Sequence, residues 1–547
     1  MNEDQELKEQ ETKEQEWKEQ KWNKQDLIQQ QWNQQKLNQQ KLNQQKLNQQ
    51  EIKNQNFQMI QKKPGLLSGI YALFFTFCLY KNAAGVTMPF FVAGTLFYFY
   101  LCMKKSEVLR KKDGYFYEVS ILLLGCSTWI TGDSRIILFN YGAIFLLLVM
   151  FMLHQFFRDE KWDIPEFIGN MISAVFGTIG SLHRPFTDYN SYIKGKNKEK
   201  RQIVPYIFAG LLIALPLIII ILMLLSSADL VFARSLEFIW KNIVIPENFI
   251  GILLLTLFAY FASYCFISYL TTVRKDMQKG KRKTGEPVIA ITFNALIALV
   301  YLIFSGIQIL YLFVGNLKLP DNYTYAQYAR EGFFQLVAVC ILNLAIVLFC
   351  IFYYKENKIL KILLTLISIC TYIMIASSTL RMVLYIGQYN LTFLRVFVLW
   401  ALVVIFMVMT GILIYIWKPE FGLLKYLTIV ITVLYLLFSY SHPDYFIADY
   451  NYSKIPLEES EKISTWYLFE LSSDAAPVIL EYATRLENEA GFEMTESQKE
   501  DFKEYFQQIY DQNNHMDFRT FNLSGYFGQK AANQYLQEHI SKDIKFK

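Results

Sequence analysis

The chain has 547 residues, of which 53% are apolar and 16% aromatic, including 45 Phe and 36 Tyr. That composition argues against a set of soluble domains. The net charge of +5 is small and comes largely from short loops, so it indicates membrane topology rather than nucleic-acid binding. The seven Cys and five His show no metal-ligand spacing, and we expect no disulfide framework, metal or cofactor.

Residues 1–61 form a low-complexity tail rich in Gln, Asn and Lys, with the repeat QKLNQQKLNQQKLNQQ. One apolar residue recurs at every fifth position. Five residues advance a helix by about 500°, so successive apolar groups are rotated by about 140° and build no continuous stripe. A heptad seam is therefore excluded, and the tail is expected to be disordered or to serve as a self-association or partner-binding arm.

Between residues 62 and 440, apolar runs of spanning length alternate with short polar loops. This pattern predicts an all-α polytopic transmembrane bundle of about eleven spans in the lipid bilayer. The small residues and flanking charges of 164–182 favour an interfacial or re-entrant helix there. The expected spans are 66–80, 84–103, 115–131, 136–153, 203–226, 248–270, 288–315, 331–354, 359–378, 393–416 and 423–440.

Basic residues gather on alternate loops, which hold roughly 24 Lys and Arg against about 8 in the intervening loops. Since positive loops are retained in the cytoplasm, the N-terminus is expected inside and, with an odd number of spans, the C-terminus outside. The protein would then be a multi-pass protein of the cell membrane.

Residues 441–547 are predicted to form a small helical extracytoplasmic domain. The segment 443–454 is expected to be a connector, followed by helices near 462–488, 496–511 and 527–541. Ser472, Ser473 and Asp474 are plausible caps for the first helix. Asp133 and Arg135 are interpreted as the polar cap of a short loop.

Polar side chains recur at helical spacing in three apolar stretches, around 294–308, 324–335 and 381–389. Because polar groups are costly in hydrocarbon, these stripes should face protein or water. Two interpretations remain open, namely interhelical hydrogen bonding and a polar cavity open to the outer face. The candidate cavity residues are Asp229, Asn294, Tyr301, Gln308, Tyr325, Tyr328, Arg330, Glu331, Gln335, Arg381, Tyr385, Tyr389 and Arg395. We expect Glu331 and Arg381 to pair across the bundle, because a buried unpaired ion is costly.

Several motifs resemble a bacterial family of polytopic membrane proteins known as domain of unknown function 4173, which is related to family 4153. The matching motifs are LLSSADLVFA (224–233), GIQILYLF (306–313), YTYAQYAREGFFQLVAV (323–339), LRMVLYIGQYNLTFLR (380–395), PDYFIADYNYSK (443–454), LSSDAAPVIL (471–480) and FRTFNLSGY (518–526). The resemblance implies a membrane protein with its C-terminal domain included, and it implies no activity.

No phosphate-binding loop, nucleophile elbow or metalloprotease motif is present in the sequence. The favoured hypothesis is a non-enzymatic envelope protein, either a carrier or a sensor of a small molecule or lipid. The alternative is a membrane enzyme, for example a transferase acting on a lipid-linked substrate at the outer face. Its acid–base and charge-stabilising groups would come from Asp229, Glu331, Arg381 and Arg395. A scaffold whose tails recruit partners is a third possibility.

The predicted orientation can be tested with single cysteines. Gln278→Cys, in a basic loop, should resist an impermeant maleimide in intact cells, whereas Ser460→Cys should react rapidly. Labelling of the first site without the second would mean that the orientation is inverted.

Overall fold

The computed structural model describes residues 65–159, 162–189, 204–229, 231–235, 248–273, 284–310, 332–453, 465–488 and 494–545. The N-terminal tail, and with it the expectation for 1–61, lies outside them. The chain divides into two compact units, one made of Met1–Lys63 with His183–Lys241 and the other of Pro64–Leu182 with Asn242–Lys547. Helix α8 (Val204–Ala228) belongs to the first unit.

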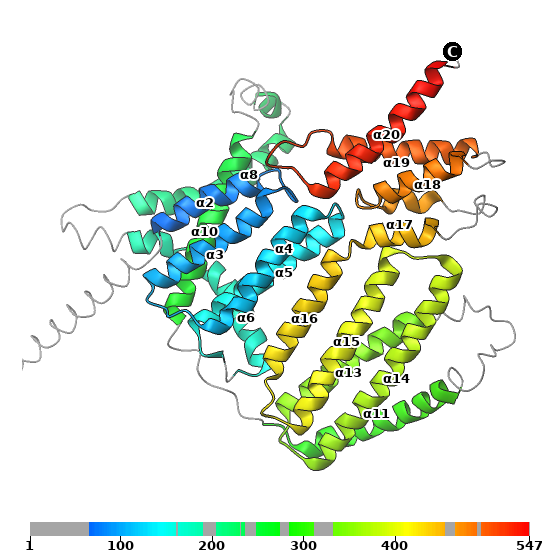
Figure 1. The fold of residues 1–547 in the computed structure, drawn as a ribbon. Helices are drawn as coiled ribbons and strands as arrows, with labels where there is room; N and C mark the ends of the chain where they lie inside the picture. The colour runs from blue at the N-terminus through cyan, green and yellow to red at the C-terminus, as the bar shows by residue number, and fades with distance from the viewer. Residues whose placement is uncertain are drawn as a thin grey trace, which may run out of the picture. The chain divides into compact units, whose positions relative to one another are not determined.

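The second unit is built from helices, as Figure 1 shows, which confirms the all-α class. Its N-terminal helices α2 to α6, together with α10, share one apolar core, and α11 with α13 to α16 share another. The first set is α2 (Gly65–Leu79), α3 (Thr87–Lys105), α4 (Tyr115–Ile130), α5 (Ser134–Phe156), α6 (Ile164–Gly180) and α10 (Phe249–Val273). The second set is α11 (Pro287–Gln308), α13 (Phe333–Tyr353), α14 (Lys358–Tyr389), α15 (Phe393–Trp417) and α16 (Leu423–Tyr440).

Seven helices in the described part of the chain are long and apolar enough to cross a membrane, so the expected number of eleven is wrong. They are α5, α10, α11, α13, α14, α15 and α16. Helices α2 and α4 have only 15 and 16 residues, which is short for a hydrocarbon core about 30 Å thick. Helix α3 is less apolar and ends in Lys104 and Lys105. Twelve of the 25 side chains of α8 lie outside the described residues.

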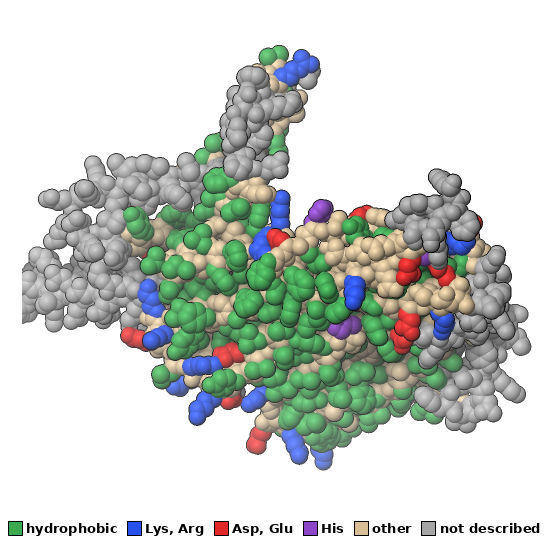
Figure 2. Space-filling view, turned by 45° about the horizontal axis from the view of Figure 1, so that its top comes forward, with side chains coloured by type: hydrophobic (Ala, Val, Ile, Leu, Met, Phe, Trp, Pro, Cys, Tyr) green, Lys and Arg blue, Asp and Glu red, His purple; other side chains and the backbone are tan. Residues whose placement is uncertain are grey.

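The apolar helices of the second unit turn much of their surface outward. Only 22% to 44% of the most apolar window of each spanning helix is buried inside the protein. Figure 2 shows hydrophobic side chains covering broad areas of the visible face, with many Lys, Arg, Asp and Glu along one margin. A soluble protein rarely exposes apolar patches of this size, so the protein is a multi-pass membrane protein.

Two of the spanning helices, α5 and α14, have a local side chain that caps the first turn. The carboxylate of Asp133 accepts a hydrogen bond from the Arg135 amide at the start of α5 (2.9 Å). The side chain of Asn357 does the same for Ile359 at the start of α14 (2.8 Å). Such caps replace the backbone partners that a first helical turn lacks. Helix α14 continues to Tyr389, eleven residues beyond the expected end at 378.

The C-terminal region consists of α17 (Pro443–Ser453), the 3-10 helix η5 (Thr465–Glu470), α18 (Ala476–Asn488), α19 (Glu496–Asn513) and α20 (Leu523–Lys545). The expected connector at 443–454 is therefore a helix, because Pro443 at its first position has the backbone angle that a helix start requires. Phe506 of α19 stacks on Tyr535 of α20 with ring centroids 4.5 Å apart, and both side chains are buried. These aromatic rings form the centre of the C-terminal core.

The C-terminal region is bound to one end of the helix bundle by backbone-directed hydrogen bonds. The Asn522 amide donates to the carbonyl oxygens of Ala84 (2.8 Å), Trp129 (2.9 Å) and Thr131 (3.0 Å). Figure 1 shows α17 to α20 gathered at this end of α4, α5, α15 and α16. One side chain thus fixes the start of α20 to two separate turns of the bundle.

Inside the bundle, Asn140 of α5 joins α4 and α16. Its amide donates to Ser127 Oγ (3.3 Å), and its carbonyl oxygen accepts from the hydroxyls of Tyr435 and Ser439 (both 2.7 Å). Asn140 is fully buried. This buried amide therefore links three helices through their polar side chains and holds them in register.

Replacement of Asn140 by Ala should lower the free energy of unfolding by about 1–2 kcal/mol, because the hydroxyls of Ser127, Tyr435 and Ser439 each lose one hydrogen bond. Thermal unfolding in detergent measures the effect. Asn514→Ala, at an exposed position, is the control. Equal melting temperatures for the two variants would contradict a structural role for the Asn140 hydrogen bonds.

Candidate functional site

A buried ion cluster lies where the C-terminal region meets the bundle. Arg135, in the first turn of α5, donates through Nε and Nη2 to the two carboxylate oxygens of Asp133 (2.9 and 3.0 Å). The same Nη2 donates to Asp444 Oδ1 of α17 (2.6 Å). Asp133 is 1% exposed and Asp444 0%. The Arg135 guanidinium also lies 3.9 Å from the centroid of the Phe393 ring. One guanidinium is therefore shared by two buried carboxylates from separate parts of the chain.

The pKa of Asp444, the second carboxylate, reflects this shortage of positive charge. Burial raises the pKa of Asp444, and the neighbouring charge of Asp133 raises it further. Arg135 and the hydrogen bond from the Ser472 amide to Asp444 Oδ2 (2.9 Å) act in the opposite direction. Asp444 thereby ties the loop before α18 to the ion cluster.

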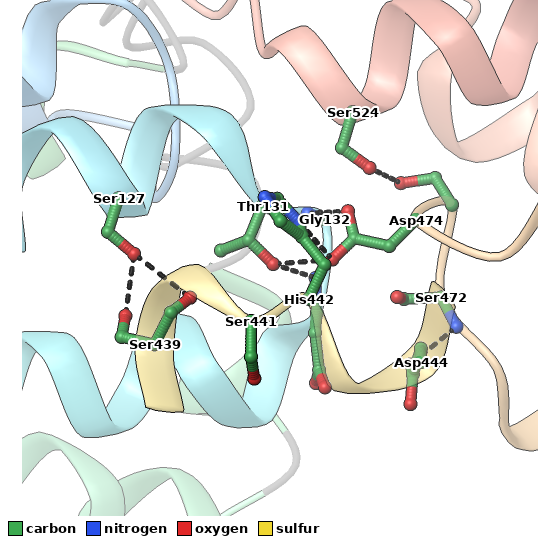
Figure 3. Close-up of polar contacts among 12 residues, drawn as sticks. Ser127, Thr131, Gly132, Ser439, Ser441, His442, Asp444, Ser472, Asp474 and Ser524 are labelled. Carbon is green, nitrogen blue, oxygen red and sulfur yellow. Dashed lines mark hydrogen bonds and ion pairs between the residues drawn. The ribbon is translucent and has the colours of Figure 1, made fainter. Parts of the chain in front are cut away.

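Two residues further along this loop, Asp474 binds the turn between α4 and α5. Its Oδ1 accepts from the Gly132 amide (2.8 Å) and its Oδ2 from Thr131 Oγ1 (2.7 Å). A Cβ on Gly132 would collide with Ser473 Oγ, so the close approach of the two loops requires glycine. Asp474, expected to cap α18, instead joins the C-terminal region to the bundle, as Figure 3 shows.

His442, which follows the end of α16, also contacts Asp474. Its Nδ1 lies 3.2 Å from Asp474 Oδ2. His442 lies between α16 and Pro443. Its φ of +48° is in the left-handed region, which is strained for a residue other than glycine. The hydrogen bond that His442 Nδ1 donates to the Asp474 carboxylate raises the pKa of His442. Burial by itself raises the pKa of Asp474, but the bond and the charge of His442 outweigh it, so that pKa is lowered.

The His442–Asp474 pair lines a cavity of about 400 Å³. The walls come from the end of α4, the residues around His442, the start of α18 and the start of α20. The lining residues are Ile130, Ser441, His442, Tyr445, Ser473, Asp474, Pro477, Leu523, Ser524 and Phe527. Within the described residues no hydrogen bond engages Nε2 of His442. The cavity thus combines an apolar lining with a titratable imidazole, three serine side chains and a carboxylate.

The residues of the predicted polar stripes lie elsewhere, within the second helix set. Tyr301 donates to Asn343 Oδ1 (2.6 Å), and the Asn343 amide donates to Thr371 Oγ1 (2.9 Å). Gln308 Oε1 accepts from Ser377 (2.8 Å) and lies 3.4 Å from Arg381 Nη2. These contacts are of the interhelical kind that the first interpretation described.

Asn294 and the Arg381 side chain are also placed by contacts with neighbouring helices. The Asn294 amide donates to Ala290 O (2.8 Å) and contacts Cys350 Sγ (3.3 Å). A Cβ added at Gly332 would lie 3.2 Å from Arg381 Nη1, so Arg381 is beside the residue that follows Glu331. Glu331 itself lies outside the described residues, and its pairing with Arg381 stays a prediction.

A smaller cavity of about 170 Å³ is lined by Tyr385 and Arg395. The Arg395 guanidinium lies 4.4 Å from the Tyr385 ring centroid. Gln335 and Tyr389 are exposed. Asp229 belongs to the other unit, where it is exposed and accepts from the Val231 amide (2.7 Å). Tyr325, Tyr328 and Arg330 lie outside the described residues, so the structure brings together only part of the candidate set.

The residues of the ion cluster and the imidazole pair were not identified as a site from the sequence. Asp133 and Arg135 were interpreted as a local cap because they are two residues apart, and their partner Asp444 is 309 residues from Arg135. A signal was available, since Asp444 and Asp474 both fall in motifs that carry the family resemblance.

Comparison with known families gives one match. The family model described as a domain of unknown function (DUF4153) matches residues 119–482, which include Asp133, Arg135, His442, Asp444 and Asp474. The more specific resemblance to family 4173 is not shown, whereas the related family 4153 is. Comparisons with curated proteins and with solved structures return no match.

The His442–Asp474 pair predicts a pH-dependent stability. The pKa of His442 is raised, so its contribution is complete below 6.5 and is lost as the pH rises through the folded pKa. The pKa of Asp474 is lowered, so its contribution is present above 3.8 and is lost on acidification. His442→Gln should therefore destabilise the protein by about 1–3 kcal/mol near pH 6 and by less near pH 9.

Melting temperatures of both proteins across this pH range measure the difference. His515→Gln, at an exposed histidine of the C-terminal region, is the matched control and should show no such trend. A constant difference between wild type and His442→Gln at all pH values would contradict the charged pair.

Proposed function

We propose a function for this chain, which belongs to the DUF4153 family, from the cavity beside His442. The chain is a non-enzymatic envelope protein that senses a small molecule or lipid bound in this cavity. The family description carries no activity, so the proposal depends on the geometry of this one site.

The distribution of basic residues over the loops supports the orientation that the proposal uses. The loops at 104–112, 355–361 and 417–425 lie at the ends of their helices away from His442, and Lys and Arg concentrate there. By the positive-inside rule those ends are cytoplasmic. The cavity and the C-terminal region are then extracytoplasmic, where a ligand outside the cell or in the outer leaflet can reach them.

The observation that carries the proposal is that the cavity has walls from both the bundle and the C-terminal region. Ile130 belongs to α4, whereas Pro477 and Leu523 belong to α18 and α20. A ligand that contacts both parts stabilises the docked arrangement over an undocked one by its difference in affinity for the two. Binding is therefore converted into a change in how firmly the C-terminal region is held, which is what a sensor requires.

The lining indicates the chemical class of the ligand. Leu523, Phe527 and Pro477 offer an apolar surface for a hydrocarbon body. The protonated imidazole of His442, whose Nδ1 already binds Asp474, has Nε2 left to donate to an acceptor. A small amphipathic molecule or lipid with a hydroxyl, carboxylate or phosphate group meets both requirements.

An enzyme is the second candidate, because a carboxylate that holds Nδ1 of a histidine fixes the ring as in general-base catalysis. The strained backbone of His442 favours this alternative as well. The substrate would be a lipid-linked molecule at the same face. The two candidates differ in whether the bound molecule is recovered unchanged.

A ligand retained through mild detergent extraction should be visible by native mass spectrometry as an added mass on the wild-type protein. Leu523→Trp fills the cavity and His442→Gln removes the polar group, so both should reduce the ligand-bound fraction about tenfold. Leu109→Trp, at a residue that is 89% exposed, is the matched control.

Equal ligand occupancy in all four proteins would exclude the cavity as the binding site. Recovery of the ligand with its mass unchanged after prolonged incubation favours the sensor. Conversion of the ligand by the wild type that stops in His442→Gln favours the enzyme instead.

A further inference from the structure

A second and larger cavity, of about 510 Å³, lies at the opposite ends of α5 and α16 from His442. Its walls come from α4, the end of α5, the start of α6, and the turn between α15 and α16. The lining residues are Asp113, Phe116, Tyr117, His154, Asp159, Trp162, Asp163, Ile164, Phe352, Tyr415, Pro419, Glu420, Phe421, Gly422, Leu423, Leu424, Lys425, Thr428 and Ile429. None of these residues lines the cavity at His442, so the two are separate.

The lining carries more negative than positive charge. Asp159 is paired with Lys111 Nζ (3.2 Å) and with His154 Nδ1 (2.7 Å), and Asp113 with Lys425 Nζ (3.2 Å). In the described part of the chain, no cation pairs with the carboxylates of Asp163 and Glu420. The cavity lining therefore has two carboxylates in excess, both exposed, which favour a cation over an anion at short range.

Aromatic rings make up much of the remaining wall. Trp162, Tyr415 and Phe421 line the cavity near the excess carboxylates, and Tyr117 lies beside His154 with centroids 5.6 Å apart. Aromatic rings bind organic ammonium groups through their negative faces, and a wall of several such rings is the usual recognition device for alkylated ammonium. A bare metal ion fits less well, since no group of three metal-ligating side chains occurs among the residues described.

A histidine ring nitrogen next to the cavity lacks a hydrogen-bond partner in the described structure. His154 Nε2 is buried and has no hydrogen-bond partner in the described structure, while Nδ1 of the same ring binds Asp159. A buried ring nitrogen without a partner is costly unless another molecule supplies one.

We propose that this cavity binds an organic ammonium cation, either as a free small molecule or as the head group of a membrane lipid. The ammonium group lies between the carboxylates of Asp163 and Glu420 and the aromatic wall. The site is independent of the sensing cavity, so either proposal can fail without the other.

The test uses the full chain in detergent, with tetramethylammonium chloride as the probe and sodium chloride at equal ionic strength as the reference. The melting temperature of the wild type should rise with the probe and not with sodium. The double variant Asp163→Asn/Glu420→Gln should bind the probe about tenfold more weakly. Phe421→Leu, which keeps the charge and removes one ring, should also weaken binding, whereas general charge screening predicts no change.

The matched control is Glu496→Gln/Asp511→Asn, which removes two exposed carboxylates of the C-terminal region and should bind the probe like the wild type. Nanodiscs distinguish the source of the cation. Stabilisation by phosphatidylcholine over phosphatidylglycerol, without an effect of the free probe, assigns the site to a lipid head group. The proposal is overturned if neither the probe nor phosphatidylcholine stabilises the wild type more than the double variant.

Discussion

The sharing of Arg135 between Asp133 and Asp444 is the contact on which the rest of the C-terminal arrangement depends. Two buried carboxylates and one guanidinium are stable only when all three are in place, because each ion left alone is costly in an apolar surrounding. Asp444 can reach Arg135 only if α17 starts directly after α16. Its second oxygen then binds the Ser472 amide and sets the position of the loop before α18. Asp474 and His442 meet as a consequence.

The same constraint explains why the most polar site lies at the end of the bundle. In the apolar part of the second unit, several of the described polar groups bind one another across helices, as Asn140 does with Tyr435 and Asn343 does with Tyr301. Such hydrogen bonds hold a bundle together but leave little capacity for a ligand. At the end of the spans, charged groups can be satisfied by loops and by water. Buried ions and an open cavity occur together there, whereas in the hydrocarbon region they would not be tolerated.

Composition and periodicity were sufficient to predict an all-α multi-pass protein. In lipid, a helix is the simplest structure in which every backbone N–H and C=O group has a hydrogen-bond partner. The number of spans was overestimated, since an apolar run such as that of α2 or α4 predicts a buried helix as readily as a crossing one. The inward direction of the stripe at Tyr301 and Gln308 could be anticipated from the cost of exposing amides to lipid. The link between Arg135 and Asp444 could not be anticipated from the sequence, because nothing local in either segment specifies a partner some three hundred residues away.

The two cavities lie at opposite ends of the same pair of helices, which limits how one could influence the other. Helix α16 begins at the wall of the larger cavity and ends two residues before His442. Helix α5 has Arg135 near its start and His154 near its end. Sliding α16 along α5 would break the hydrogen bonds that Asn140 makes with Tyr435 and Ser439. It would also separate Asp444 from Arg135. A ligand can supply only its difference in affinity between two states, typically 1–3 kcal/mol of coupling, and both breaks together cost more than that. A signal from the cavity at His442 therefore passes to the C-terminal region that shares its wall, and the helices between the two cavities act as a rigid support.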